Sequence, residues 1–261
     1  MVHGAFHEMW GPFRLGFRWA PPMIDGLWAA GVDLHDLTLE RVRREVTVAF
    51  WGDLVRPGPR PVDEVLAELS GDDGTGLVGL SAQFESDGPA ALNNVAKALA
   101  AETNRRSTEL LGRYFTDPDM RTRIHERLER HLGPDTRVVV AHSMGTVIAY
   151  QVLCAHPELE IRQLITLGSP LGTPGLVLDQ LDPPPVDGKG TWPSCVDQWT
   201  NVAAEGDLAT TAAPALAPVF GERLQDEYVF NGRHPHDIEP YLTAAETGAA
   251  LAAGLELLRR D

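Results

Sequence analysis

The chain has little of several features that would point to particular partners. Its only lysines are Lys97 and Lys189, and 37 acidic residues outnumber 22 basic ones, which gives a formal net charge of −15. Nucleic-acid phosphates and anionic lipids attract clustered basic side chains, so we expect neither as a partner. Two cysteines in 261 residues are too few for a disulfide scaffold. The arginine, glycine and proline usage is typical of a bacterial protein from a GC-rich genome.

Long apolar segments are missing as well. No run is long enough to cross a bilayer, and no apolar segment near the N-terminus resembles a signal peptide. We therefore expect a cytoplasmic protein with no membrane span. Metal-ligand patterns such as HExxH are missing too, so we expect no metal and no cofactor. Nothing in the sequence specifies an oligomeric state.

What is present is an alternation of short apolar runs with helical patterns. Strands are predicted at 45–51, from about 137, at 161–167, near 199–203 and at 228–230. A helix is predicted from Pro118, with Met120, Ile124, Leu128 and Leu132 on its apolar face. A capping box of Thr243 and Glu246 predicts a last helix that runs to Leu258. This alternation predicts a single α/β domain over 1–261, with a mostly parallel sheet covered by helices on both faces.

The segment 53–135 is a long insertion between the strand at 45–51 and the strand that begins near 137. Its helical faces, such as Leu92, Val95 and Leu99, predict a helical lid over the carboxyl edge of the sheet, with the glycine-rich stretch 71–76 as its most mobile part. Such a lid would shape the substrate pocket.

The most informative stretch is the turn after the β-branched run at 138–140. Ala141, His142, Ser143, Met144 and Gly145 match the G-x-S-x-G pattern of a nucleophile elbow, with alanine at the first glycine position. Small flanking residues fit a tight strand-to-helix turn. An apolar helical pattern follows at once, so Ser143 is the candidate nucleophile at a helix N-terminus.

A serine hydroxyl needs a base, and the base needs an orienting carboxylate. After the strand near 199–203 comes Asp207, our candidate acid, with Glu205 as the second choice. Before the last helix come His234 and His236. We favour His236 as the base because Pro235 holds His234 extended.

An oxyanion requires two backbone N–H donors. Met144, directly after the serine, supplies one. His3 and Gly4 near the N-terminus are a typical lead-in to the second donor, which we assign to Ala5, with Phe6 next to it as the alternative.

These motifs, together with Gly168-Ser169-Pro170 after the strand at 161–167, resemble those of the α/β-hydrolase superfamily, and most closely its bacterial lipase/esterase-like branch. The resemblance implies an α/β-hydrolase fold and a serine hydrolase that cleaves a small-molecule carboxylic ester or thioester through an acyl-enzyme.

Two alternatives stay open. An acyltransferase or thioesterase of specialised metabolism would use the same triad, with an alcohol, amine or thiol as acceptor. A non-catalytic binding protein on the same fold is a different class, since fold does not fix function.

Overall fold

The computed structural model describes residues 1–35, 37–56, 58–59, 61 and 105–257. The chain divides into two compact units, one formed by Met1–Val55 with Pro118–Asp261 and the other by Arg56–Asp117. The first unit contains the sheet and every candidate site residue. In the second unit, residues 105–116 are helical. The predicted helical face at 92–99 and the glycine-rich stretch 71–76 fall outside the described residues, so the lid stays a prediction.

The first unit is built on a sheet of four parallel strands in the order β1-β2-β3-β4. The strands are β1 (Val138–His142), β2 (Ile161–Leu167), β3 (Val196–Ala204) and β4 (Gln225–Val229). The α/β class and the parallel sheet predicted from the sequence are therefore confirmed. Because the strands are parallel, their carboxyl ends meet at one edge of the sheet.

The N-terminus extends this sheet beyond β1. Val2 forms parallel bridges with Ala141 on one side and with Ala49 on the other. The strand predicted at 45–51 is thus reduced to a single bridge at Ala49. The reason is that the paired stretch Met1–Val2 is so short, and farther along the chain the Trp51 N–H donates to the His3 side chain instead of to a neighbouring strand.

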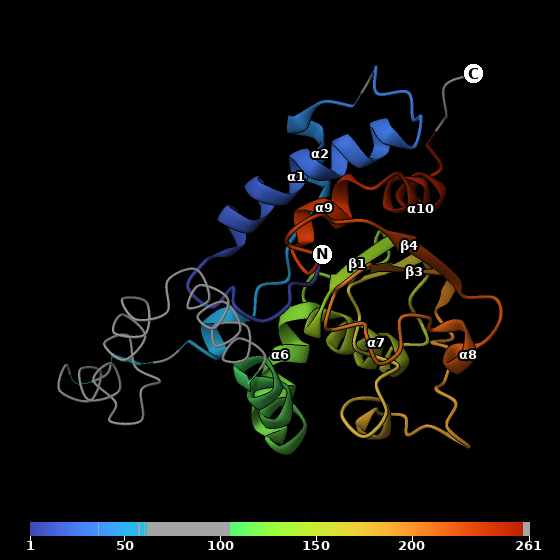
Figure 1. Cartoon of the computed structure of the whole chain (residues 1–261). Helices are drawn as coiled ribbons and strands as arrows, with labels where there is room; N and C mark the ends of the chain where they lie inside the picture. The colour runs from blue at the N-terminus through green and yellow to red at the C-terminus, as the bar shows by residue number, and fades with distance from the viewer. Residues whose placement is uncertain (36, 57, 60, 62–104, 258–261) are drawn as a thin grey trace, which may run out of the picture. The chain divides into compact units, whose positions relative to one another are not determined.

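Helices cover both faces of the sheet (Figure 1). On one face, α7 (Met144–Ala155) packs on β1, and α6 (Pro118–Glu129) packs on α7. On the other face lie α1 (Pro12–Ala29), α9 (Ile238–Thr243) and α10 (Ala245–Leu255). The shorter elements are α2 (Leu39–Glu45), α8 (Ala217–Phe220) and the 3-10 turns Gly52–Leu54 and Leu178–Gln180.

Helix α6 has the apolar face that the sequence predicts. Met120, Ile124 and Leu128 are buried, and Leu132 just beyond the helix is half-buried. This helix belongs to the unit that contains the sheet. The second unit therefore ends at Asp117 and is shorter than the insertion expected over 53–135.

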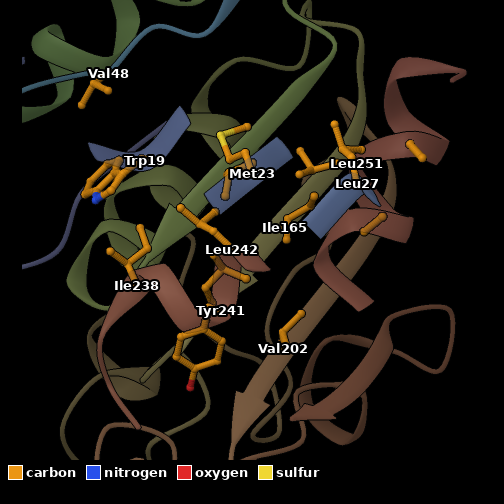
Figure 2. Packing of buried hydrophobic residues seen from close by; sticks show 14 of the residues in the cluster. Trp19, Met23, Leu27, Val48, Ile165, Val202, Ile238, Tyr241, Leu242 and Leu251 are labelled. Atoms are coloured by element: carbon orange, nitrogen blue, oxygen red, sulfur yellow. The ribbon is translucent and has the colours of Figure 1, made fainter. Parts of the chain in front are cut away.

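No helix was predicted over residues 12–29, and α1 contains Pro21 and Pro22 although proline disfavours a helix interior. Packing outweighs that cost. Leu15, Trp19, Met23 and Leu27 recur at helical spacing and join the main apolar cluster. Figure 2 shows the last three facing residues of β2, β3, α9 and α10. No helix among the described residues is long and apolar enough to cross a membrane.

The end of the chain differs from the predicted capped helix. Thr243 is the last residue of α9, and its hydroxyl donates to the Pro240 carbonyl at 2.9 Å. Ala244 is the N-cap of α10 and offers no side-chain cap. The capping box of Thr243 and Glu246 is therefore wrong. Helix α10 packs directly on α1. Gly248 allows this close approach, because a Cβ there would lie 1.9 Å from the Gly26 carbonyl oxygen.

Candidate active site

Ser143 occupies a strained turn at the carboxyl edge of the sheet. It follows β1 directly, precedes α7, and has φ 53° and ψ −130°, a region that L-residues rarely adopt. Such strain costs on the order of 1–3 kcal/mol and persists only where the surroundings impose it. Here the Ser143 N–H donates to the Leu167 carbonyl at the end of β2, at 3.0 Å. The structure therefore places Ser143 on the predicted sharp turn between a strand and a helix.

Two glycines allow the N-terminal turn to approach this serine. A Cβ on Gly145 would lie 2.6 Å from the His3 carbonyl oxygen and 2.7 Å from that of Val2. A Cβ on Gly4 would lie 2.7 Å from the Ser143 Cβ. These distances are too short for a side chain at either position. Glycine is therefore required at 4 and 145 because the N-terminal turn lies directly against the elbow, in addition to the tightness of the elbow itself.

The structure brings the three predicted residues together. The His236 Nε2 lies 2.9 Å from the Ser143 Oγ, and the His236 Nδ1 lies 2.9 Å from both Asp207 carboxylate oxygens. Because a carboxylate only accepts, Nδ1 carries the hydrogen and Nε2 is left as an acceptor for the serine hydroxyl. The alternatives, Glu205 and His234, are exposed and lie outside this chain of hydrogen bonds.

Asp207 is held from several directions. Its side chain is fully buried, Oδ1 accepts from the Ala209 N–H at 2.9 Å, and Oδ2 accepts from the Tyr241 hydroxyl at 2.6 Å. The hydroxyls of Thr210 and Thr211 donate to its main-chain carbonyl. Sequence reasoning missed Tyr241, because a tyrosine in a helix carries no local signal of a partner in another loop.

The turn formed by His3, Gly4, Ala5 and Phe6 is fixed by the buried His3 and the half-buried His7. The His3 Nδ1 donates to the Gly4 carbonyl at 2.7 Å, and its Nε2 accepts from the Trp51 N–H at 3.1 Å. Burial lowers the pKa of His3 to about 3, so its ring is neutral. The two ring nitrogens of His3 therefore act as one donor and one acceptor.

His7 holds the next peptide of the same turn. Its Nδ1 donates to the Ala5 carbonyl at 2.9 Å. In a planar trans peptide the N–H points opposite to the C=O, so His3 and His7 together direct the N–H groups of Ala5 and Phe6 away from themselves. Met144 is the first residue of α7, where N–H groups have no acceptor within the helix. The proximity of Gly4 to Ser143 brings both predicted donor segments beside the serine, and their role in an oxyanion hole stays a prediction.

His142 links the elbow to the loop that carries His236. Its Nε2 donates to the His236 carbonyl at 2.9 Å, and the two ring centroids are 4.8 Å apart. Burial first, and the neighbouring His236 second, lower the pKa of His142 well below its ordinary value. A neutral His142 thus fixes the main chain of the loop. Its Nδ1 finds no partner among the described residues.

Ser169, the other serine near the site, is in a different environment. It is buried, its Oγ lies 2.9 Å from the Thr146 Oγ1, and it accepts from the Leu171 N–H. No base lies against it in these contacts. Within the described ranges, no group of three or more His, Cys, Asp or Glu side chains is placed to hold a metal ion.

The arrangement can supply an activated hydroxyl, a base for its proton and a buried negative charge behind that base. A scan against protein-family models, a search of curated proteins and a search of solved structures found no match to this chain. Any functional conclusion must therefore come from the chemistry of these residues.

Proposed function

We propose that this protein is a serine hydrolase with an α/β-hydrolase fold that cleaves a carboxylic ester or thioester through an acyl-enzyme. The single observation that carries this is the unbroken hydrogen-bonded chain from Ser143 through His236 to Asp207, with the serine on a strained elbow. An isolated Gly/Ser turn would need neither a buried carboxylate nor a histidine with both nitrogens engaged.

The hydrolase fold is part of the proposal. In support, the elbow serine follows β1 of an all-parallel sheet, the acid follows β3 and the histidine follows β4. Ligands of open α/β sheets bind outside the carboxyl ends of the strands, which is where these three residues lie.

The chemistry follows from the geometry. The Ser143 Oγ attacks the acyl carbon while the His236 Nε2 takes its proton, and the ionised Asp207 stabilises the resulting imidazolium. The Met144 and Ala5 N–H groups would bind the oxyanion. His236 then returns the proton to the departing alkoxide or thiolate, leaving an acyl group on Ser143. In the second half, His236 takes a proton from a water whose oxygen attacks the acyl carbon, and it returns this proton to the Ser143 Oγ as the bond to the acyl group breaks and the carboxylic acid leaves.

Hydrolysis of p-nitrophenyl esters of increasing chain length, and of an acyl thioester, tests the proposal. We expect turnover by the wild type and a fall of at least about 10⁴-fold for Ser143→Ala. The matched control is Ser169→Ala, which removes a buried serine hydroxyl outside the hydrogen-bonded chain and should keep most of the activity. Equal turnover by the wild type and Ser143→Ala, or none by either, would contradict the proposal.

A further inference from the structure

The residue behind the catalytic acid is Tyr241 of α9. It is fully buried and belongs to the main apolar cluster together with Ile238 and Leu242. Figure 2 shows its ring leaving this cluster with the hydroxyl at the far end, away from the other labelled side chains. The phenol therefore connects the apolar core to the polar site.

The hydroxyl of Tyr241 has two partners whose chemistry assigns its proton. It lies 3.0 Å from the Ala204 N–H at the end of β3, and 2.6 Å from the Asp207 Oδ2. An amide N–H only donates, so the hydroxyl accepts there and must donate to the carboxylate. Burial first, and the nearby Asp207 second, raise the pKa of Tyr241, so the phenol keeps this proton across the working pH range.

This bond constrains the carboxylate that faces His236. Both Asp207 oxygens lie 2.9 Å from the His236 Nδ1, and each has one further donor, the Ala209 N–H for Oδ1 and Tyr241 for Oδ2. We propose that Tyr241 is a positioning residue of the triad, whose hydroxyl orients the Asp207 carboxylate and draws negative charge away from it. The inference rests on the proposed function, because it assigns a role in the same reaction.

The expected effect on the base has a definite sign. Without the hydroxyl, the Asp207 carboxylate carries more of its charge toward His236, and the imidazole then holds its proton more tightly. The acidic limb of the pH profile of kcat/KM reports protonation of the essential base in the free enzyme. Tyr241→Phe should therefore move this limb to higher pH.

The other charged and titratable groups around the pair do not change in this comparison. His142 from β1 is neutral, Glu205 on the loop after β3 is exposed, and Glu239 of α9 is paired with Arg18 of α1. Asp237 beside His236 is exposed as well. A shift of the limb on changing Tyr241 alone would thus be attributable to its hydroxyl.

The chain offers a matched control in Tyr150. This tyrosine of α7 is also fully buried, and its hydroxyl also accepts from a main-chain N–H, that of Thr191 at 3.1 Å. It donates to the Thr191 carbonyl at 2.9 Å, where Tyr241 donates to a carboxylate. Neither contact involves the triad. Tyr150→Phe therefore removes a buried hydroxyl that both donates and accepts, without touching Asp207.

The experiment measures kcat/KM for p-nitrophenyl acetate between pH 5 and 9 for the wild type, Tyr241→Phe and Tyr150→Phe. We expect Tyr241→Phe to lose about tenfold in kcat/KM, mostly in kcat, and its acidic limb to rise by about half a pH unit, with the limb of Tyr150→Phe unmoved. Coincident limbs for all three proteins, or equal shifts in both variants, would overturn the positioning role.

Tyr241→Phe also leaves the Ala204 N–H without its acceptor and could fail to fold, so a second replacement keeps the shape. Replacing Tyr241 by 3-fluorotyrosine makes the phenol a stronger donor, and the acidic limb should then move to lower pH. An unmoved or raised limb would refute the inference. A wild type with no esterase activity would instead refute the proposed function, and the two failures are thereby distinguished.

Discussion

The two segments beside Ser143, the turn from His3 to Phe6 and the loop that carries His236, are held in place by different interactions. We call them the turn side and the histidine side. On one side, the turn from His3 to Phe6 is fixed by glycines that allow backbone contact, by the buried neutral His3 and by the half-buried His7. On the other side, His236 is held by a buried carboxylate, and its own side chain is 41% exposed. Changes on the histidine side should therefore remove chemistry and leave stability. Changes on the turn side should affect stability and its pH dependence, and should lower turnover less than changes on the histidine side.

The largest effect is expected from His236→Ala. This change removes the proposed base, so kcat for p-nitrophenyl acetate should fall at least about 10⁴-fold. Because the side chain is partly exposed, the midpoint of thermal unfolding should stay close to that of the wild type. His234→Ala is the control, and a greater loss of turnover in that variant would reverse the assignment of the base.

Gly145→Ala should push the turn from His3 to Phe6 away from Ser143. The new Cβ would meet the main-chain oxygens of His3 and Val2, which accept from the Trp51 indole N–H and the His142 N–H and cannot rotate away. We expect a loss of about 2–3 kcal/mol in the free energy of unfolding, measured with urea, together with slower labelling of Ser143. Gly133→Ala, where a Cβ meets nothing within 4 Å, is the control. Equal stability of the two variants would mean that the approach of the turn is looser than described.

Acid should lower the free energy of unfolding through His3, which lies in the turn from His3 to Phe6. The pKa of His3 is lowered to about 3 in the folded protein, so between its ordinary value and that value only the unfolded chain binds the proton. Stability should therefore fall as the pH decreases through this window. For His3→Gln, which keeps one donor and one acceptor, the loss between pH 7 and 5 should be smaller by about 2 kcal/mol.

Urea unfolding at the two pH values measures this difference. His156→Gln is the control, because Glu158 raises the pKa of His156 and its contribution has the opposite sign. If His3→Gln loses as much stability as the wild type, the buried neutral state of His3 is not responsible for the acid sensitivity.

The smallest effect is expected from His7→Phe. The phenyl ring keeps the packing against Trp10 and Trp19 but cannot donate to the Ala5 carbonyl. The Ala5 and Phe6 peptides would be less well directed, and kcat should fall about tenfold with KM nearly unchanged. A change confined to KM would indicate that His7 contributes to substrate binding rather than to the oxyanion donors.

The same contrast explains which parts of the site were predictable. The elbow is a local pattern, and chain order led from it to Asp207 and His236, which the structure places in hydrogen-bond contact with each other and Ser143. The hydrogen bonds of Tyr241, His142 and His7 were not predicted. Their partners lie far away in sequence or in a neighbouring turn, and the residue type alone does not indicate such a contact.

The fold shows the same limits. Strands β1 to β3 are strong apolar runs and were expected close to their observed positions. Helix α1 was not predicted; two prolines lie inside it, and the burial of Trp19 and Leu27 against other elements stabilises it. The capping box was wrong because the Thr243 hydroxyl bonds within α9, a choice that depends on where α9 ends.

The most direct test of the account is to identify the residue that reacts with a fluorophosphonate. Ser143 and Ser169 both lie near the carboxyl edge of the sheet, but only Ser143 has a histidine nitrogen against its hydroxyl. Peptide mass spectrometry of the labelled protein should find the phosphonyl adduct on Ser143, and Ser143→Ala should not be labelled. An adduct on Ser169, or no adduct on any serine, would contradict the account.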